Sequence, residues 1–112
     1  MAKDKSDVIA SLYTAFAYES LTISDTTKVL TASKYTFADA EDKVSYAKRA
    51  IIVVENAQLR YLYDGVNTPT ATEGLLRNPM DVIILTGATN IRNFNTIRKG
   101  TTDAKIFVVY ER

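Results

Sequence analysis

Turn signals divide this chain into short strand-like runs, and this spacing restricts the fold more than any other feature. The four glycines, Gly65, Gly74, Gly87 and Gly100, all lie between such runs, where backbone of positive φ is needed. Short strands with a turn about every 8–12 residues are typical of sandwiches and barrels. We therefore predict an all-β fold, an antiparallel β-sandwich or jelly-roll-like barrel of about six to eight strands.

Residue alternation predicts where the individual strands lie. Residues 27–37 read as a strand because Val29, Thr31, Tyr35 and Phe37 share one parity. Residues 50–55 are apolar and mostly β-branched, which indicates a buried strand. Further strands are predicted at 59–63, at 80–86 and at 104–110, the last of these apolar on both faces. The three-residue spacing in 91–97 fits neither period, and a strand with a bulge would reconcile it.

Three segments remain open between two interpretations. Residues 6–16 fit either a short helix or an extended arm, and residues 38–49 fit either a helix or a loop between strands. Residues 55–57 are short enough for a hairpin or a bulge. With 112 residues the chain is expected to be a single domain, comprising an N-terminal arm and first strand (1–24) and a sandwich (25–112).

Composition removes most catalytic chemistry. The chain has no histidine and no cysteine, which excludes a Ser-His-Asp triad, disulfides and thiolate zinc sites. Neither a Gly-x-Ser-x-Gly motif nor a phosphate-binding glycine loop is present. We expect no enzyme and no cofactor. The acidic residues at 39–42 fit a solvated loop, and an oxygen-ligand calcium site there stays open.

Charge and hydropathy favour a protein partner. The chain has 14 basic and 13 acidic residues, a net charge of +1, so no electrostatic imbalance points to nucleic acid or to an anionic membrane. No apolar run approaches the ~20 residues that span a bilayer. We expect a protein made in a cytoplasm, with neither a membrane nor a nucleic acid as its partner.

A polar loop, residues 64–79, follows the apolar strand at 50–55 and the tyrosine-rich run at 59–63. Long loops beside rigid strands commonly carry function. This loop has neither a nucleophile–base pair nor a set of metal ligands, so we interpret it as a docking surface, together with the N-terminal arm. The candidate partner-binding residues are Arg60, Tyr63, Asp64, Asn67, Thr70, Arg77 and Arg92.

From Ala50 onward the chain resembles small auxiliary virion proteins of tailed bacteriophages. The resemblance rests on the order and spacing of these segments: Ala50-Ile51-Ile52-Val53-Val54, Arg60-Tyr61, Asp64-Gly65, Pro69-Thr70, Gly74, the apolar run 81–85, Asn90-Ile91-Arg92-Asn93-Phe94 and Val108-Val109-Tyr110.

The resemblance implies a non-enzymatic capsid decoration (cement) protein located in the virion. It would bridge subunits of the major capsid protein, or bind other virion proteins, as a homo-oligomer for which a trimer is favoured. The alternatives are a neck or tail adaptor ring protein and a carbohydrate-binding adhesion module.

Overall fold

The computed structural model describes residues 12–112 and shows an all-β, sandwich-like fold. The strands are β1 (Ala15–Ile23), β2 (Lys28–Val29), β3 (Thr36–Ala38), β4 (Val44–Tyr46), β5 (Arg49–Glu55), β6 (Leu59–Leu62), β7 (Leu75–Arg77), β8 (Val82–Thr86), β9 (Asn95–Arg98) and β10 (Ala104–Glu111). Within residues 12–112, two short helices lie between strands, α2 (Ala32–Tyr35) and α3 (Ala88–Asn93).

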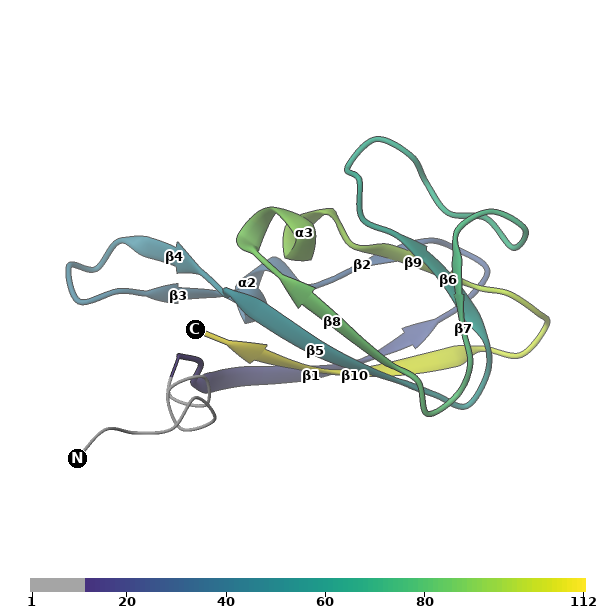
Figure 1. Ribbon diagram of the computed structural model, residues 1–112, viewed down its shortest axis with the longest axis horizontal. Helices are drawn as coiled ribbons and strands as arrows, with labels where there is room; N and C mark the ends of the chain where they lie inside the picture. The colour runs from purple at the N-terminus through teal and green to yellow at the C-terminus, as the bar shows by residue number, and fades with distance from the viewer. Residues whose placement is uncertain (1–11) are drawn as a thin grey trace, which may run out of the picture.

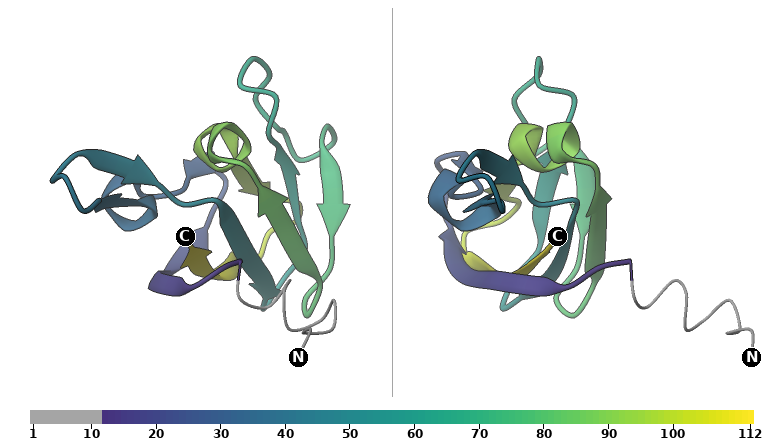
Figure 2. Two further views of the ribbon diagram at one scale, coloured as in Figure 1. Left: turned by 60° about the vertical axis from the view of Figure 1, so that its left-hand side comes forward. Right: turned by 90° about the vertical axis from the view of Figure 1, so that its left-hand side faces the viewer.

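Two four-stranded antiparallel sheets form the body of the protein (Figure 1). Sheet A has the order β1-β10-β5-β8, and sheet B has the order β2-β9-β6-β7. The hairpin of β3 and β4 extends away from this body (Figure 2). Because β10 pairs with both β1 and β5, the two longest strands lie side by side within sheet A.

The core lies on one face of sheet A. Every second residue of β5 and β10 is buried, whereas the residues between them are half-buried or exposed. This period-2 pattern is what a sheet with one covered face produces. Sheet B supplies Leu59, Tyr61 and Thr96 to the same core, and Phe94 after α3 is fully buried there.

One polar cluster is built into this interior. The hydroxyl of Tyr110, which is fully buried, donates a hydrogen bond to Glu19 Oε2. The backbone N–H of Thr31 donates to the same oxygen at 3.1 Å. Glu19 is 7% exposed, so its hydrogen-bond donors offset part of the cost of removing a carboxylate from water.

The structure confirms the all-β class, corrects two local predictions and decides between the two interpretations left open for residues 38–49. The strand predicted over 27–37 is wrong as a continuous element, because α2 separates β2 from β3. Residues 38–49 contain the turn of the β3–β4 hairpin and strand β4, not a helix. The bulged strand predicted over 91–97 is wrong in its first half, where α3 ends at Asn93 before β9 begins.

The sequence also left two other segments open, the link between β5 and β6 and the chain before β1. Residues 55–57 form neither a hairpin nor a bulge, since β5 belongs to sheet A and β6 to sheet B. The interpretation of residues 6–16 as helix or arm falls mostly outside the described residues. From Ala15 onward the chain is strand β1.

Candidate functional site

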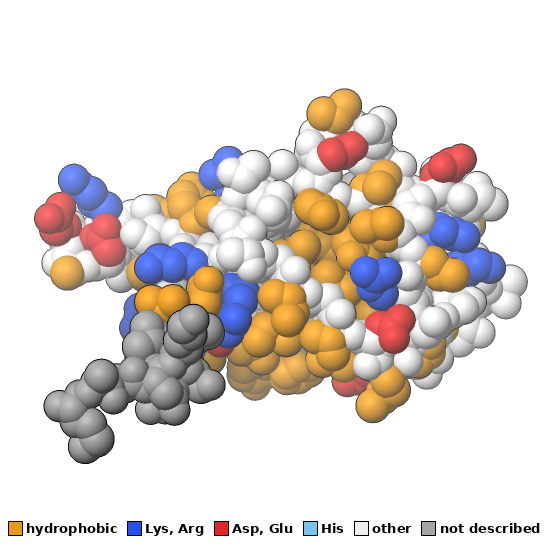
Figure 3. Space-filling view, in the orientation of Figure 1, with side chains coloured by type: hydrophobic (Ala, Val, Ile, Leu, Met, Phe, Trp, Pro, Cys, Tyr) orange, Lys and Arg blue, Asp and Glu red, His pale blue; other side chains and the backbone are white. Residues whose placement is uncertain are grey.

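The side of sheet A that points away from the core is apolar. We define its outer face as Tyr18, Ile51, Val53, Val82, Ile84, Phe107 and Val109. Tyr18 is 64% exposed, Ile84 is 58% exposed and Val82 is 52% exposed. Hydrophobic side chains gather over β5 and β8 in the space-filling view (Figure 3). Contiguous exposed apolar surface of this kind marks interaction sites.

Strand register arranges the outer face in two continuous rows. One row runs Tyr18–Val109–Ile51–Ile84, and the other runs Ser20–Phe107–Val53–Val82. The rings of Tyr18 and Phe107 stack with centroids 5.6 Å apart, which places both large aromatic rings on the β1–β10 side. The four strands of sheet A therefore present an apolar surface, in which Ser20 is the one polar side chain of the two rows.

Charged residues mark the two ends of this surface. At one end Glu111 of β10 lies opposite Arg49 of β5, and their side chains form an ion pair of 2.5 Å. At the other end Lys105 of β10 lies opposite Glu55 of β5. The hydrogen bond from Arg49 to Glu111 raises the pKa of the guanidinium, and the ring of Tyr13 lies 4.0 Å from the same group.

The predicted docking loop is a self-contained turn structure. Asp64 accepts hydrogen bonds from the backbone N–H groups of Val66 and Asn67 and from the Asn67 side chain. These donors, Asn67 first, hold the pKa of Asp64 below its ordinary value. Thr70 Oγ1 likewise accepts from the backbone N–H groups of Thr72 and Glu73.

Arg60 stabilises the same loop through two hydrogen bonds to its backbone. Its Nε donates to the carbonyl of Ala71 and its Nη1 to the carbonyl of Gly74, each at 3.0 Å. Gly74 has φ +129°, and a Cβ there would lie 3.2 Å from the carbonyl oxygen of Tyr61. The polar side chains that made this loop a candidate docking surface are therefore largely used to fold it.

The two other arginines lie on different elements. Arg77 on β7 donates to the hydroxyl of Tyr61 at 3.2 Å and lies 5.4 Å from its ring. Arg92 on α3 lies 5.2 Å from the ring of Tyr46 on β4. The predicted residues thus divide between the loop, sheet B and the contact of α3 with the β3–β4 hairpin.

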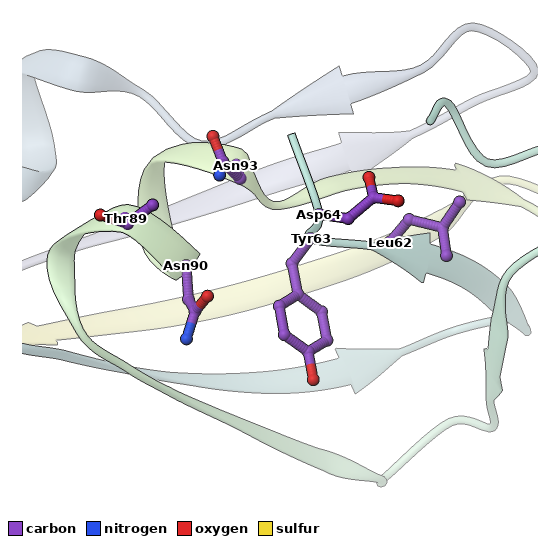
Figure 4. Close-up of a pocket in the computed structure, with 6 residues that line it drawn as sticks. All are labelled: Leu62, Tyr63, Asp64, Thr89, Asn90 and Asn93. Atoms are coloured by element: carbon purple, nitrogen blue, oxygen red, sulfur yellow. The ribbon is translucent and has the colours of Figure 1, made fainter. Parts of the chain in front are cut away.

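Tyr63 and Asp64 line a pocket with α3. Its volume is about 360 Å³, and its other lining residues are Leu62, Thr89, Asn90 and Asn93. Figure 4 shows the Tyr63 ring and the Asn90 side chain extending in the same direction, with the Asp64 carboxylate pointing away from the ring. Asn90 Nδ2 donates to the carbonyl of Thr86 at 3.0 Å. The pocket combines an aromatic ring with amide and hydroxyl groups.

The acidic segment at 39–42 forms a hairpin turn. Asp39 Oδ1 accepts from the backbone N–H groups of Glu41 and Lys43 at 2.8 and 3.0 Å. These hydrogen bonds, that from Lys43 first, lower the pKa of Asp39. Among residues 12–112 no group of three or more acidic side chains is placed to hold a metal ion. In the same part of the chain no helix is long and apolar enough to cross a membrane.

Sequence reasoning missed the outer face as a site, although a signal for it was present. Residues 50–54 and 106–110 are apolar at consecutive positions, which is typical of strands covered on both faces. In the described chain only one face of sheet A is covered, by the core. The second set of apolar residues therefore marks a surface suited to a further layer.

Comparison with known proteins identifies no relative. The chain matches no protein-family model, no curated protein and no solved structure.

Proposed function

We propose that this protein is a non-enzymatic structural component of a tailed-phage particle. It assembles with further copies of itself and with the major capsid protein or another virion protein, and so stabilises the head as a decoration protein. The observation that carries the proposal is the apolar outer face of sheet A. The location in the virion is inferred from the sequence resemblance.

The outer face supports an assembly role on energetic grounds. Exposed apolar surface contributes roughly 25 cal/mol for each Å² that a partner removes from water. Subunits held in this way stabilise the assembled shell by mass action, because binding occurs only to the assembled state. The polar loop between β6 and β7 of sheet B is folded by its own hydrogen bonds, so few of its polar groups are left to bind a partner.

Purified particles provide the test. We expect the protein to be present in particles, at hundreds of copies for a decoration protein, whereas a neck or tail adaptor would be present at about six or twelve, as ring symmetry requires. Ile84→Asp on the outer face should remove it from particles. Val29→Asp is the matched control, since Val29 is similarly exposed (54%) but lies on β2 of sheet B.

Two results would contradict the proposal. One is absence of the wild-type protein from particles, and the other is equal incorporation of Ile84→Asp and wild type.

The pocket beside α3 favours a second function, binding of a neutral carbohydrate. Tyr63 is 40% exposed, and Thr89, Asn90 and Asn93 line the same pocket with hydroxyl and amide groups. Such a mixture suits small ligands that need both stacking and hydrogen bonds. NMR titration with neutral oligosaccharides should shift the Asn90 and Asn93 amides in wild type and not in Tyr63→Ala. Unshifted wild-type spectra would remove this alternative.

A further inference from the structure

We propose that the outer face of sheet A binds the outer face of a second copy of this chain, around a two-fold axis that runs parallel to the strands between β10 and β5. This inference rests on the proposed function and deepens it, because it names the partner of the surface that carries it. Two sheets that pack face to face lie about 10 Å apart with their strands roughly 30° from parallel. Such packing would cover each outer face with the sheet of the other copy, since nothing in the described part of the chain covers it.

The charges at the ends of the outer face are self-complementary. Glu111 and Lys105 lie at opposite ends of the row on β10, and Arg49 and Glu55 lie opposite them on β5. Rotation about the proposed axis places β10 of one copy over β5 of the other. Glu111 then faces Arg49 of the second copy and Lys105 faces Glu55, so each cation meets an anion. Isologous contact of this kind requires a surface that matches itself.

The distribution of side-chain size determines the direction of the axis. The large rings of Tyr18 and Phe107 lie on β1 and β10, whereas β5 and β8 carry smaller aliphatic residues. An axis along the strands places Tyr18 over Ile84 and Phe107 over Val53, so large side chains face small ones. An axis across the strands also matches the charges, but it would place β1 and β10 of one copy over the same strands of the other, so that all the aromatic rings lie on one side of the layer and only aliphatic side chains on the other. Alternation of large and small residues gives the better-packed layer.

The size of the surface sets the expected affinity. Four strands about 4.8 Å apart, with four outward rows about 6.8 Å apart, cover roughly 520 Å² of flat sheet. Side-chain relief makes the accessible area larger, which brings it toward the about 800 Å² per partner of a standard interface. We expect a dimer with a dissociation constant in the micromolar range.

Sedimentation equilibrium of the purified full-length protein tests the inference over about 1–200 µM. Wild type should pass from monomer to dimer in this range. Glu55→Lys or Lys105→Glu should each raise the dissociation constant about tenfold, because like charges then face each other twice in the two-fold contact. The double variant Glu55→Lys/Lys105→Glu should return to near the wild-type value, since it exchanges the charges of a facing pair.

The double variant also tests the axis. With an axis across the strands, the exchanged charges would face Glu111 and Arg49 of like sign, and the double variant would dimerise worse than either single variant. Lys28→Glu on β2 of sheet B is the control and should leave the dissociation constant unchanged. Thermal unfolding of each variant separates loss of the dimer from loss of the fold, and Ile84→Asp, whose side chain is exposed in the monomer, should be folded and monomeric.

The results of these experiments distinguish failure of the dimer from failure of the proposed function. A wild type that stays monomeric or forms a trimer overturns the inference, as does a double variant that is not rescued. If wild type is monomeric but Ile84→Asp is still lost from particles, the outer face belongs to a capsid partner and the proposed function stands. If wild type dimerises as expected but is absent from particles, the dimer stands and the proposed function fails.

Discussion

Replacing Tyr110 by phenylalanine removes one hydroxyl group from the interior while the ring remains to fill its site. The hydroxyl donates to Glu19 Oε2, and Thr31 N–H donates to the same oxygen. Hydrogen bonds to charged groups contribute about 1.5–3 kcal/mol, and Glu19 is only 7% exposed, so water replaces the lost donor poorly. We expect Tyr110→Phe to lower the free energy of unfolding by about 2 kcal/mol.

Urea unfolding followed by circular dichroism measures this loss. A domain of this size should also lose about 8 °C in melting temperature. Tyr18→Phe is the matched control: its hydroxyl belongs to a side chain that is 64% exposed, so its removal should change stability by less than about 0.5 kcal/mol. Equal stability of the two variants would refute the stabilising role of the Tyr110–Glu19 hydrogen bond.

The same pair predicts how stability changes in alkali. Burial, followed by the hydrogen bond to Glu19, raises the pKa of Tyr110 well above its ordinary value. The contribution is complete below the unfolded pKa of about 10. Above it the unfolded chain loses the proton while the folded chain retains it, so stability falls by about 1.4 kcal/mol per pH unit. Tyr110→Phe lacks this dependence, and the stability gap between it and wild type should narrow above about pH 10. An unchanged gap there would contradict the assignment.

Two further predictions concern the loop between β6 and β7. Gly74→Ala should destabilise the protein by about 2 kcal/mol in urea unfolding, because φ is +129° and the new Cβ would lie 3.2 Å from the Tyr61 carbonyl oxygen. Gly100→Ala, with nothing within 4 Å, is the control and should be neutral. By carbon-detected NMR, Asp64 should titrate below the ordinary 3.8, and Asn67→Ala should raise this pKa. The contribution of Asp64 to stability is present above the pKa of the unfolded state and is lost as pH falls through the pKa of the folded state. An ordinary pKa for Asp64 in wild type would contradict the hydrogen bonds assigned to this turn.

Much of the fold follows from local pattern, and the exceptions have physical causes. The strands at β5, β8 and β10 were predictable because side-chain alternation and β-branched residues need no knowledge of distant contacts. The strand predicted over 27–37 was wrong where the chain turns into α2, immediately after Thr31. The Thr31 N–H is bound by Glu19 from a distant strand, and sequence alternation carries no information about this long-range contact.

The helix α3 shows a different cause of error. Ile91 and Phe94 are both fully or almost fully buried, and their three-residue spacing is that of one helical turn. The spacing was present in the sequence, but the surrounding strands favoured a bulge instead. A short helix inside a β protein is therefore easily missed when neighbouring segments determine the interpretation.

The candidate site was less predictable than the fold. The loop was a candidate docking surface because it is polar and follows rigid strands, yet Arg60, Asp64 and Thr70 use their polar groups to fold it. The outer face of sheet A depends on which side of each strand meets sheet B, and this is a property of the tertiary arrangement. The sequence indicated that the middles of β5 and β10 are apolar at consecutive positions, but not which half of these side chains would remain exposed.

The position of β10 has a consequence for biosynthesis. This strand lies between β1 and β5 in sheet A, so its residues must emerge from the ribosome before either neighbour can complete its pairing. Pairing of β1 with β10 also closes a loop that contains every other strand, and such long closures slow folding. The outer face therefore becomes a flat, ordered surface only after β10 has been translated, and the association proposed for this face would have to follow that step.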